Sequence, residues 1–115
     1  MNHTQPVVIT GIGAISPVGL DIDTSWHQLI AGQSGIEFIT AFDTTGFETT
    51  FAGEVKGFNP ENYMERKDAR RMDRFAQFAV AAAKEACKQA SLEVSALDPF
   101  RTGVVVGSGI GGIVT

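Results

Sequence analysis

The sequence predicts an α/β protein, and three observations support this class. Two runs rich in β-branched residues, at 7–10 and 102–106, have the composition of strands, and both lead into glycines. Between them, alanines and larger apolar residues recur at three- and four-residue steps in a stretch that ends near Ala90, as in one long helix. Strand, helix and strand in this order indicate an α/β arrangement, and residues 1–115 show no internal domain boundary.

The first strand and the helix after it are bounded by clear signals. Residues 7–10 read as a buried strand that enters a tight loop at Gly11 and Gly13. Asp23 is the predicted N-cap of a short amphipathic helix, and Gly32 is placed for a left-handed residue after its end. We therefore expect strand, glycine loop and helix within the first third of the chain.

The segment 33–60 has no single periodicity, but it carries five of the eight phenylalanines. Residues 51–55 are a possible short strand within it. So many aromatic rings are unusual for a solvated linker. We expect an irregular, well-packed segment whose rings pack onto something.

The clearest helix is predicted from about Asp68 or Arg71 to Ala90. Its apolar face is mostly alanine, which lets another backbone approach closely and indicates a central, tightly packed element. The strand at 102–106 follows it and runs into the glycines that begin at Gly107.

Composition bounds the function classes. The chain has 115 residues, 43% hydrophobic and 19% charged, with a net charge of −4, which is typical of one small globular domain. Its apolar runs are much shorter than the roughly 20 residues of a membrane-spanning helix, and residues 1–6 lack signal-peptide features. A cytoplasmic location is the expectation. A single cysteine, Cys87, excludes an internal disulfide and the usual zinc cluster.

Both glycine loops were weighed as nucleotide sites. Residues 107–112 read GSGIGG, which contains GxGxxG after a strand, but the second strand and acidic residue of a dinucleotide site are missing. In the first loop Ser16 replaces the third glycine, and Pro17 stands where a helix should already run. The preferred interpretation is two turns in which the backbone passes close to packed neighbours.

No catalytic constellation is visible in the spacings. Cys87 falls near the C-terminal end of the long predicted helix, where the helix dipole opposes a thiolate, and it reads as a core residue. The two histidines, His3 and His27, form no triad with a serine or cysteine. We assign no catalytic residue and no metal site.

The informative feature is a basic cluster on an acidic chain. Five of the nine basic residues fall within nine positions: Arg66, Lys67, Arg70, Arg71 and Arg74. On one continuous helix, Lys67, Arg71 and Arg74 would share a side of its first turns, where the dipole disfavours cations. The functional hypothesis is a docking site for a compact acidic or phosphate-bearing partner rather than for nucleic acid. A solvated charged face is the alternative.

At this point the sequence resembles a known family, the beta-ketoacyl-acyl-carrier-protein synthases of the thiolase fold, in particular the elongating type II enzymes of bacterial fatty acid synthesis. Four ordered blocks carry the resemblance, and together they are specific: VVITGIGAISPVG at 7–19, Trp26 with LIAGQSGI at 29–36, KDARRMDRF at 67–75, and GSGIGG at 107–112. The chain matches the N-terminal part of the family enzymes, so the implied fold is the N-terminal portion of a layered αβαβα thiolase-like structure.

The resemblance implies an acyltransferase that elongates fatty acids by decarboxylative Claisen condensation. An acyl thioester reacts with malonyl-acyl-carrier protein, and phosphopantetheine arrives on the carrier, so no bound cofactor is expected. The family's nucleophilic cysteine and its two assisting histidines have no counterpart here, because Cys87, His3 and His27 do not match those motifs. The chain alone is expected to be inactive, and the whole enzyme to be a homodimer that binds no nucleic acid or membrane.

Two family roles are implied residue by residue. Lys67, Arg70 and Arg71 match basic positions where the acidic carrier protein docks, whereas we know no family role for Arg74. Ile110 matches a position lining the acyl pocket, where residue size tunes chain length. The alternatives are a non-catalytic carrier-protein interaction module, a type I elongating synthase and a chain-length-factor-like subunit.

Overall fold

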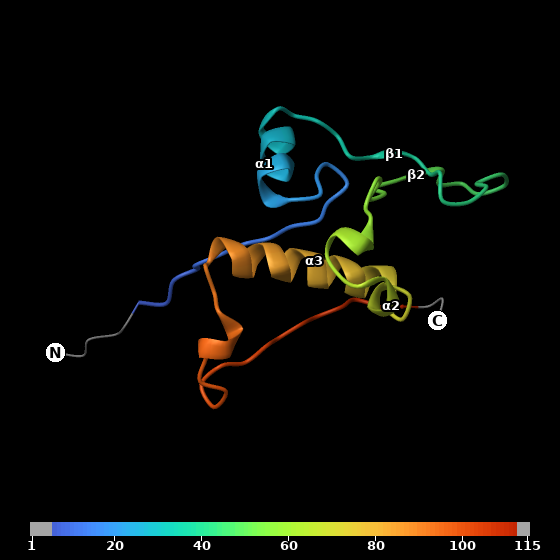
Figure 1. The fold of residues 1–115 in the computed structure, drawn as a ribbon. Helices are drawn as coiled ribbons and strands as arrows, with labels where there is room; N and C mark the ends of the chain where they lie inside the picture. The colour runs from blue at the N-terminus through green and yellow to red at the C-terminus, as the bar shows by residue number, and fades with distance from the viewer. Residues whose placement is uncertain (1–5, 113–115) are drawn as a thin grey trace.

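The computed structural model describes residues 6–112, which form two principal helices, three short helical turns and one small sheet (Figure 1). In chain order the elements are α1 (Ile22–Ile30), β1 (Glu37–Phe38), β2 (Phe51–Ala52), η1 (Pro60–Asn62), α2 (Arg66–Ala69), α3 (Arg74–Gln89) and η2 (Val94–Ala96).

The centre of the structure is the contact between α3 and the first glycine loop. A Cβ on Gly11 would lie 2.2 Å from the carbonyl oxygen of Ala86, and one on Gly13 would lie 2.1 Å from that of Ala82. Only glycine fits at such a separation. On the same helix Ala81 is fully buried. The predictions of a closely approached alanine helix and of a glycine turn against packed neighbours are therefore confirmed.

Glu85 of α3 fastens this loop and the start of α1. Its Oε2 accepts a hydrogen bond from Ala14 N at 2.9 Å, and its Oε1 accepts one from Ile22 N at 2.8 Å. One carboxylate thus satisfies two backbone donors that lie outside α3. At the C-terminal end of the helix, Gln89 Oε1 accepts from Ile12 N at 2.7 Å.

The N-cap of α1 is Asp21, so the assignment of Asp23 was wrong. Asp21 Oδ1 accepts from Thr24 N at 2.6 Å, whereas Asp23 already lies in the first turn. The bonds that the Asp21 carboxylate receives from the Thr24 backbone and hydroxyl lower its pKa below the usual value. Gly32 has a φ of 70°, which confirms the left-handed residue after the helix.

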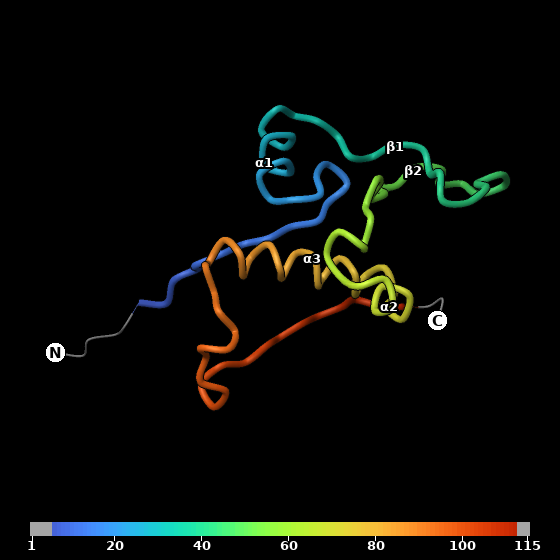
Figure 2. The backbone as a smooth tube through the Cα atoms, viewed as in Figure 1, coloured from blue at the N-terminus to red at the C-terminus, as the bar shows by residue number. Residues whose placement is uncertain are grey.

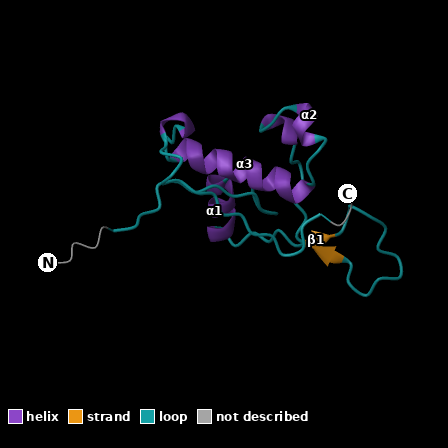
Figure 3. Ribbon diagram, turned by 90° about the horizontal axis from the view of Figure 1, so that it is seen from below, coloured by secondary structure: helices purple, strands orange, loops and turns teal. Residues whose placement is uncertain are grey.

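The predicted helix from Asp68 or Arg71 to Ala90 is interrupted at its start. Residues 66–69 form the separate short helix α2, and α3 begins only at Arg74 after an extended Asp73. Seen from below, α2 lies beside the N-terminal end of α3 (Figure 3). The chain turns here because Gln77 Nε2 binds the carbonyl oxygens of Ala69 at 2.9 Å and Met72 at 3.1 Å.

Neither predicted β-branched strand is paired within residues 6–112, and here the prediction of buried strands was wrong. Residues 7–10 and 102–106 are extended but belong to no sheet, and Val7 and Val105 are 99% and 97% exposed. In Figure 2 both segments run against the direction of α3, but the first meets the helix only where it ends, at Gly11, and Gly103 and Gly107 at the ends of the second have no atom within 4 Å of an added Cβ. A strand requires a hydrogen-bonded neighbour, and the described part of the chain supplies none at these edges.

The sheet that does form is antiparallel, with Glu37 opposite Ala52 and Phe38 opposite Phe51. The possible strand at 51–55 is thus confirmed for its first two residues. The loop between β1 and β2 is held at its base by Glu54, whose carboxylate accepts from Thr40 N and Ala41 N, both at 2.9 Å. The bonds from Thr40 lower the pKa of Glu54.

Of the five phenylalanines of segment 33–60, which were expected to pack onto something, Phe58 is buried, while four are exposed, two of which, Phe42 and Phe47, meet each other edge-on. Phe58 is 7% exposed, stacks on Tyr63 and meets the ring of Phe78 edge-on. The others are exposed on the β1–β2 arm, which extends away from α3 (Figure 1) and has no element behind it: Phe38, Phe42, Phe47 and Phe51.

The chain has an open shape. Its accessible surface is 9600 Å², against about 6,100 Å² for a compact monomer of this mass. Its radius of gyration is 17.7 Å, where about 13 Å is typical for this length. Within residues 6–112, no helix combines the length and apolar character needed to cross a bilayer.

Candidate functional site

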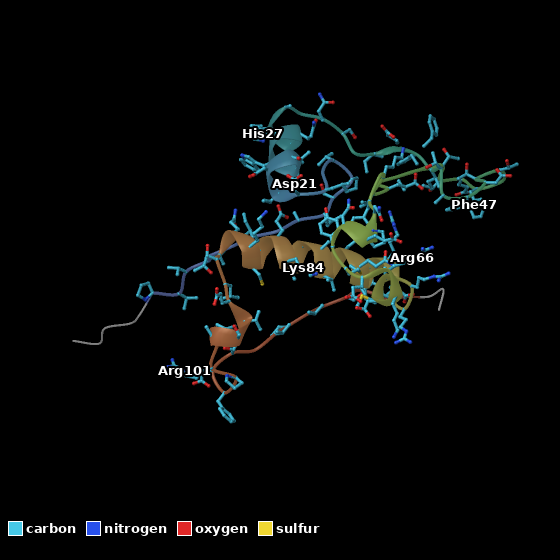
Figure 4. All side chains as sticks on the ribbon, viewed as in Figure 1. Asp21, His27, Phe47, Arg66, Lys84 and Arg101 are labelled. Carbon is cyan, nitrogen blue, oxygen red and sulfur yellow. The ribbon has the colours of Figure 1, made fainter. Side chains whose placement is uncertain are left out.

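The candidate site is built by α2 and the turn after it. Four cations, Arg66, Lys67, Arg70 and Arg71, line a shallow surface concavity of about 630 Å³, which we call the basic face. All four side chains are exposed, whereas Ala69 between them is buried and anchors α2 to the protein. Figure 4 labels Arg66 on this side of the molecule.

Within residues 6–112, most charges of the basic face are not neutralised by ion pairs. Arg66 pairs with Glu61 at 3.5 Å, between two largely exposed side chains. Among residues 6–112 no acidic side chain pairs with Lys67, Arg70 or Arg71. A surface pair such as Arg66–Glu61 is worth little, so the basic face retains a net positive potential on a chain of net charge −4.

Arg74 does not belong to this face, which corrects the expectation that it shares a side with Lys67 and Arg71. Its guanidinium donates to Val55 O at 3.0 Å and lies 5.4 Å and 4.9 Å from the ring centroids of Phe58 and Phe78. Arg74 therefore stabilises the start of α3 by a hydrogen bond and cation–π contacts.

The helix break also changes the electrostatic argument. Arg70 is the C-cap of α2 and Arg71 follows it, so both lie at a helix C-terminus, where cations are favoured. The expected penalty for cations in a first turn does not apply to them. The sequence predicted one continuous helix in place of α2 and α3. It therefore did not point to Gln77, which binds the carbonyl oxygens of the turn between them. In the sequence, the only indication of this role is an amide side chain four positions after Asp73, the N-cap of α3.

Ile110 lies on the second glycine loop, whose last glycine, Gly112, comes against Asp73 at the start of α3. It is 83% exposed, and a Cβ added at Gly107 or Gly109 would find no atom within 4 Å. Its assignment to an acyl pocket stays a prediction.

The structure brings no catalytic group to the basic face. His27 is on α1, where its Nδ1 lies 2.8 Å from Asp23 O, and Cys87 is half-buried on α3. His3 lies outside the described residues. Between residues 6 and 112 no three His, Cys, Asp or Glu side chains are grouped as a metal site would require.

Comparison with known proteins decides the family. The model of the beta-ketoacyl synthase N-terminal domain matches residues 4–114. The chain belongs to this family. Its α/β character is accordingly that of an N-terminal portion of the ketosynthase, thiolase-like fold, with the helices formed and few strands paired.

Curated relatives agree with this assignment. The chain is 54% identical over 107 residues to 3-oxoacyl-[acyl-carrier-protein] synthase 2 of Vibrio cholerae, a match that covers 93% of this chain and 26% of the relative. It is 48% identical over 115 residues to the protein of the same name from Staphylococcus aureus, covering 100% of this chain and 28% of the relative. The chain thus spans about a quarter of the length of these relatives.

Two solved structures are similar in fold and sequence. The ishigamide ketosynthase/chain length factor matches with a TM-score of 0.70 and 40% identity, covering 78% of this chain and 22% of that one. A type II polyketide synthase acyl carrier protein in complex with its ketosynthase, bound to the hexaketide, matches with a TM-score of 0.60 and 28% identity, covering 80% and 24%. In the second structure a ketosynthase is in complex with its acyl carrier protein.

Proposed function

We propose that this chain provides the carrier-docking surface and part of the acyl pocket of a 3-oxoacyl-acyl-carrier-protein synthase. Such an enzyme joins an acyl thioester to malonyl-carrier protein: the malonyl carboxylate leaves as carbon dioxide, the carbon so freed bonds to the acyl carbon, and the acyl C–S bond breaks with release of the thiol, so the fatty acyl chain grows. The family membership and the relatives of the same name support this activity. We assign no catalytic residue to this chain, since neither Cys87 nor His27 matches the family's catalytic motifs.

The observation that carries the proposal is the basic face. Lys67, Arg70 and Arg71 are exposed, unpaired among residues 6–112, and adjacent on α2 and its C-terminal turn. An acidic carrier protein fits such a surface because arginine binds carboxylates in bidentate fashion, and because long-range attraction speeds the encounter. The similar ketosynthase–carrier complex supports this class of partner.

The proposal includes three further statements. The phosphopantetheine of the carrier delivers the acyl group, and the protein holds no cofactor of its own. Ile110 lines the acyl pocket, which is consistent with an aliphatic side chain that is 83% exposed and needs an apolar cover. The enzyme acts as a homodimer in the cytoplasm.

The proposal is tested by reversing two charges of the basic face. Arg70→Glu with Arg71→Glu should weaken binding of holo-acyl carrier protein about tenfold or more at low salt, because two favourable ion pairs become repulsive. Isothermal titration at several salt concentrations measures the dissociation constant, and the salt dependence should become shallower.

The matched control is Lys88→Glu with Arg101→Glu. It changes the net charge by the same amount at exposed positions away from the basic face, and Figure 4 shows Arg101 far from Arg66. Carrier binding should stay within about twofold of the unmodified protein, the size of a remote, screened charge effect. Equal losses in the two double variants would refute specific docking on the basic face.

A second candidate is a chain-length-factor-like subunit that binds the carrier without catalysis. The 40% identity to the ketosynthase/chain length factor structure favours it as the alternative. A condensation assay with acyl- and malonyl-carrier protein separates the two, because the docking surface is shared and only the synthase releases carbon dioxide.

A further inference from the structure

The turn between α2 and α3 is closed by the backbone bonds Arg71 N to Asp68 O and Met72 N to Ala69 O, and it is tied to α3 by a side chain that the docking proposal does not use. The amide nitrogen of Gln77 donates both of its hydrogens to backbone carbonyls, to Ala69 O at 2.9 Å and to Met72 O at 3.1 Å. These two carbonyls lie on either side of Arg70 and Arg71 in the sequence. The segment that carries the two arginines is therefore fixed to α3 at both ends.

The helix α2 has little means of holding this geometry alone. It has four residues, and its N-cap Glu65 makes no side-chain capping bond. Isolated helices of this length are unstable because nucleation is costly, and their last carbonyls lack partners inside the helix. Gln77 supplies a partner to the last residue of α2, and it belongs to the long helix α3, which is itself packed against the first glycine loop.

We propose that Gln77 is a positioning residue for carrier docking, which holds Arg70 and Arg71 in the geometry that the acidic partner requires. This inference rests on the proposed docking function. Gln77 does not contribute charge and does not have to touch the partner. Its effect arises because surface arginines on a fixed turn lose less conformational freedom on binding than arginines on a loose one.

The chain offers a matched control on the same helix. Gln89 also makes a side-chain bond to distant backbone, from Ile12 N at 2.7 Å, but it lies 12 residues, or about 18 Å, further along α3. Gln77→Met and Gln89→Met therefore remove the same kind of group from opposite ends of one helix. Neither variant changes the charge of the protein.

The experiment measures holo-acyl carrier protein binding by isothermal titration, together with amide hydrogen exchange, on the purified protein and the two variants. For Gln77→Met we expect a dissociation constant about three- to tenfold higher, the size of one or two lost net hydrogen bonds, at unchanged stoichiometry. The salt dependence should match that of the unmodified protein, and exchange at Arg71 and Met72 should accelerate. Gln89→Met should change none of these.

Unchanged stoichiometry separates positioning from unfolding, since unfolding would lower the fraction of protein able to bind. If Gln77→Met does not fold, Gln77→Ala replaces it, because alanine has the highest helix propensity. It is judged by the same criteria. The inference is overturned if Gln77 variants bind as Gln89→Met does while reversal of Arg70 and Arg71 weakens binding. If that reversal has no effect, the docking function fails first and this inference fails with it.

Discussion

Gly11 and Gly13 press against the backbone of α3, whereas Gly107 and Gly109 have no atom within 4 Å of the place where a Cβ would stand. In the sequence the two loops look alike, since each follows a run rich in β-branched residues and each contains GxG. In space the first loop is part of the packed centre, whereas the second is open at Gly107 and Gly109 and approaches the start of α3 at Gly112, where an added Cβ would overlap the Asp73 side chain.

The difference shows that a glycine pattern in the sequence indicates where another segment can come close to the backbone, but it does not indicate which segment that is. For the first loop the neighbour is α3, and the alanines at the contact are visible in the sequence. For the second loop, no neighbour is found at Gly107 and Gly109 within residues 6–112, and the adjacent valines and Ile110 are exposed as well. The exposed valines of 104–106 and the exposed Ile110 together indicate an apolar surface that another protein element covers.

The largest effect on stability is expected when a glycine of the first loop is replaced by alanine, and the same replacement in the second loop is the comparison. Gly13→Ala should destabilise the protein by about 3 kcal/mol or more, because its Cβ would lie 2.1 Å from Ala82 O and the backbone would have to move. Gly107→Ala should change stability by less than about 1 kcal/mol. Urea unfolding of both variants measures the contrast, and similar losses would mean that the two loops are packed alike.

An intermediate effect is expected at Glu85, which fastens the packed loop. Glu85→Ala removes the acceptor of Ala14 N and Ile22 N, two partly buried donors, and should cost about 2 kcal/mol. Glu48→Ala, an exposed carboxylate on the β1–β2 arm, is the control and should cost less than about 0.5 kcal/mol. The free energy of unfolding at neutral pH is the measurement; no difference between the variants would show that water replaces Glu85 without loss.

The smallest effect concerns the cap of α1 and depends on pH. Asp21→Ala should cost about 1 kcal/mol at neutral pH. Since hydrogen bonds from Thr24 lower the pKa of Asp21 in the folded state, its stabilisation is complete above the ordinary value of 3.8 and is lost as the pH falls through the lowered value. The variant and the unmodified protein should therefore converge in stability at acid pH. A difference that persists there would assign the effect to something other than the ionised cap.

Elements held by interactions between residues close in sequence could be predicted, whereas those that depend on distant partners could not. Helical spacing placed α1 and most of α3 correctly, because helices are held by neighbours four residues away, although the N-cap of α1 is Asp21 and not Asp23. The start of α3 was missed, since the break depends on a side-chain bond from Gln77 to carbonyls five and eight residues earlier. The two valine-rich strands have the right composition, but a strand forms only with a partner, and composition does not identify one.

The same distinction holds for the candidate site. The cluster of cations is a matter of sequence alone, and Lys67, Arg70 and Arg71 stand together on the surface as the spacing suggested. That Arg74 leaves the cluster could not be predicted, because its position is decided by Phe58, Phe78 and the carbonyl of Val55. The sequence shows where the cations are concentrated. Tertiary contacts decide which of these side chains are held by other parts of the protein and which remain available to a partner.

The two hydrogen bonds of Glu85 also determine when the N-terminal part of the protein can fold during synthesis. They join residues 71 and 63 positions apart, so Ala14 and Ile22 leave the ribosome long before the carboxylate that binds them. Closing such long segments is slow compared with forming a local helical turn. The first 30 residues must therefore wait, with their glycine loop unsupported, until α3 has been synthesised and its helix has formed.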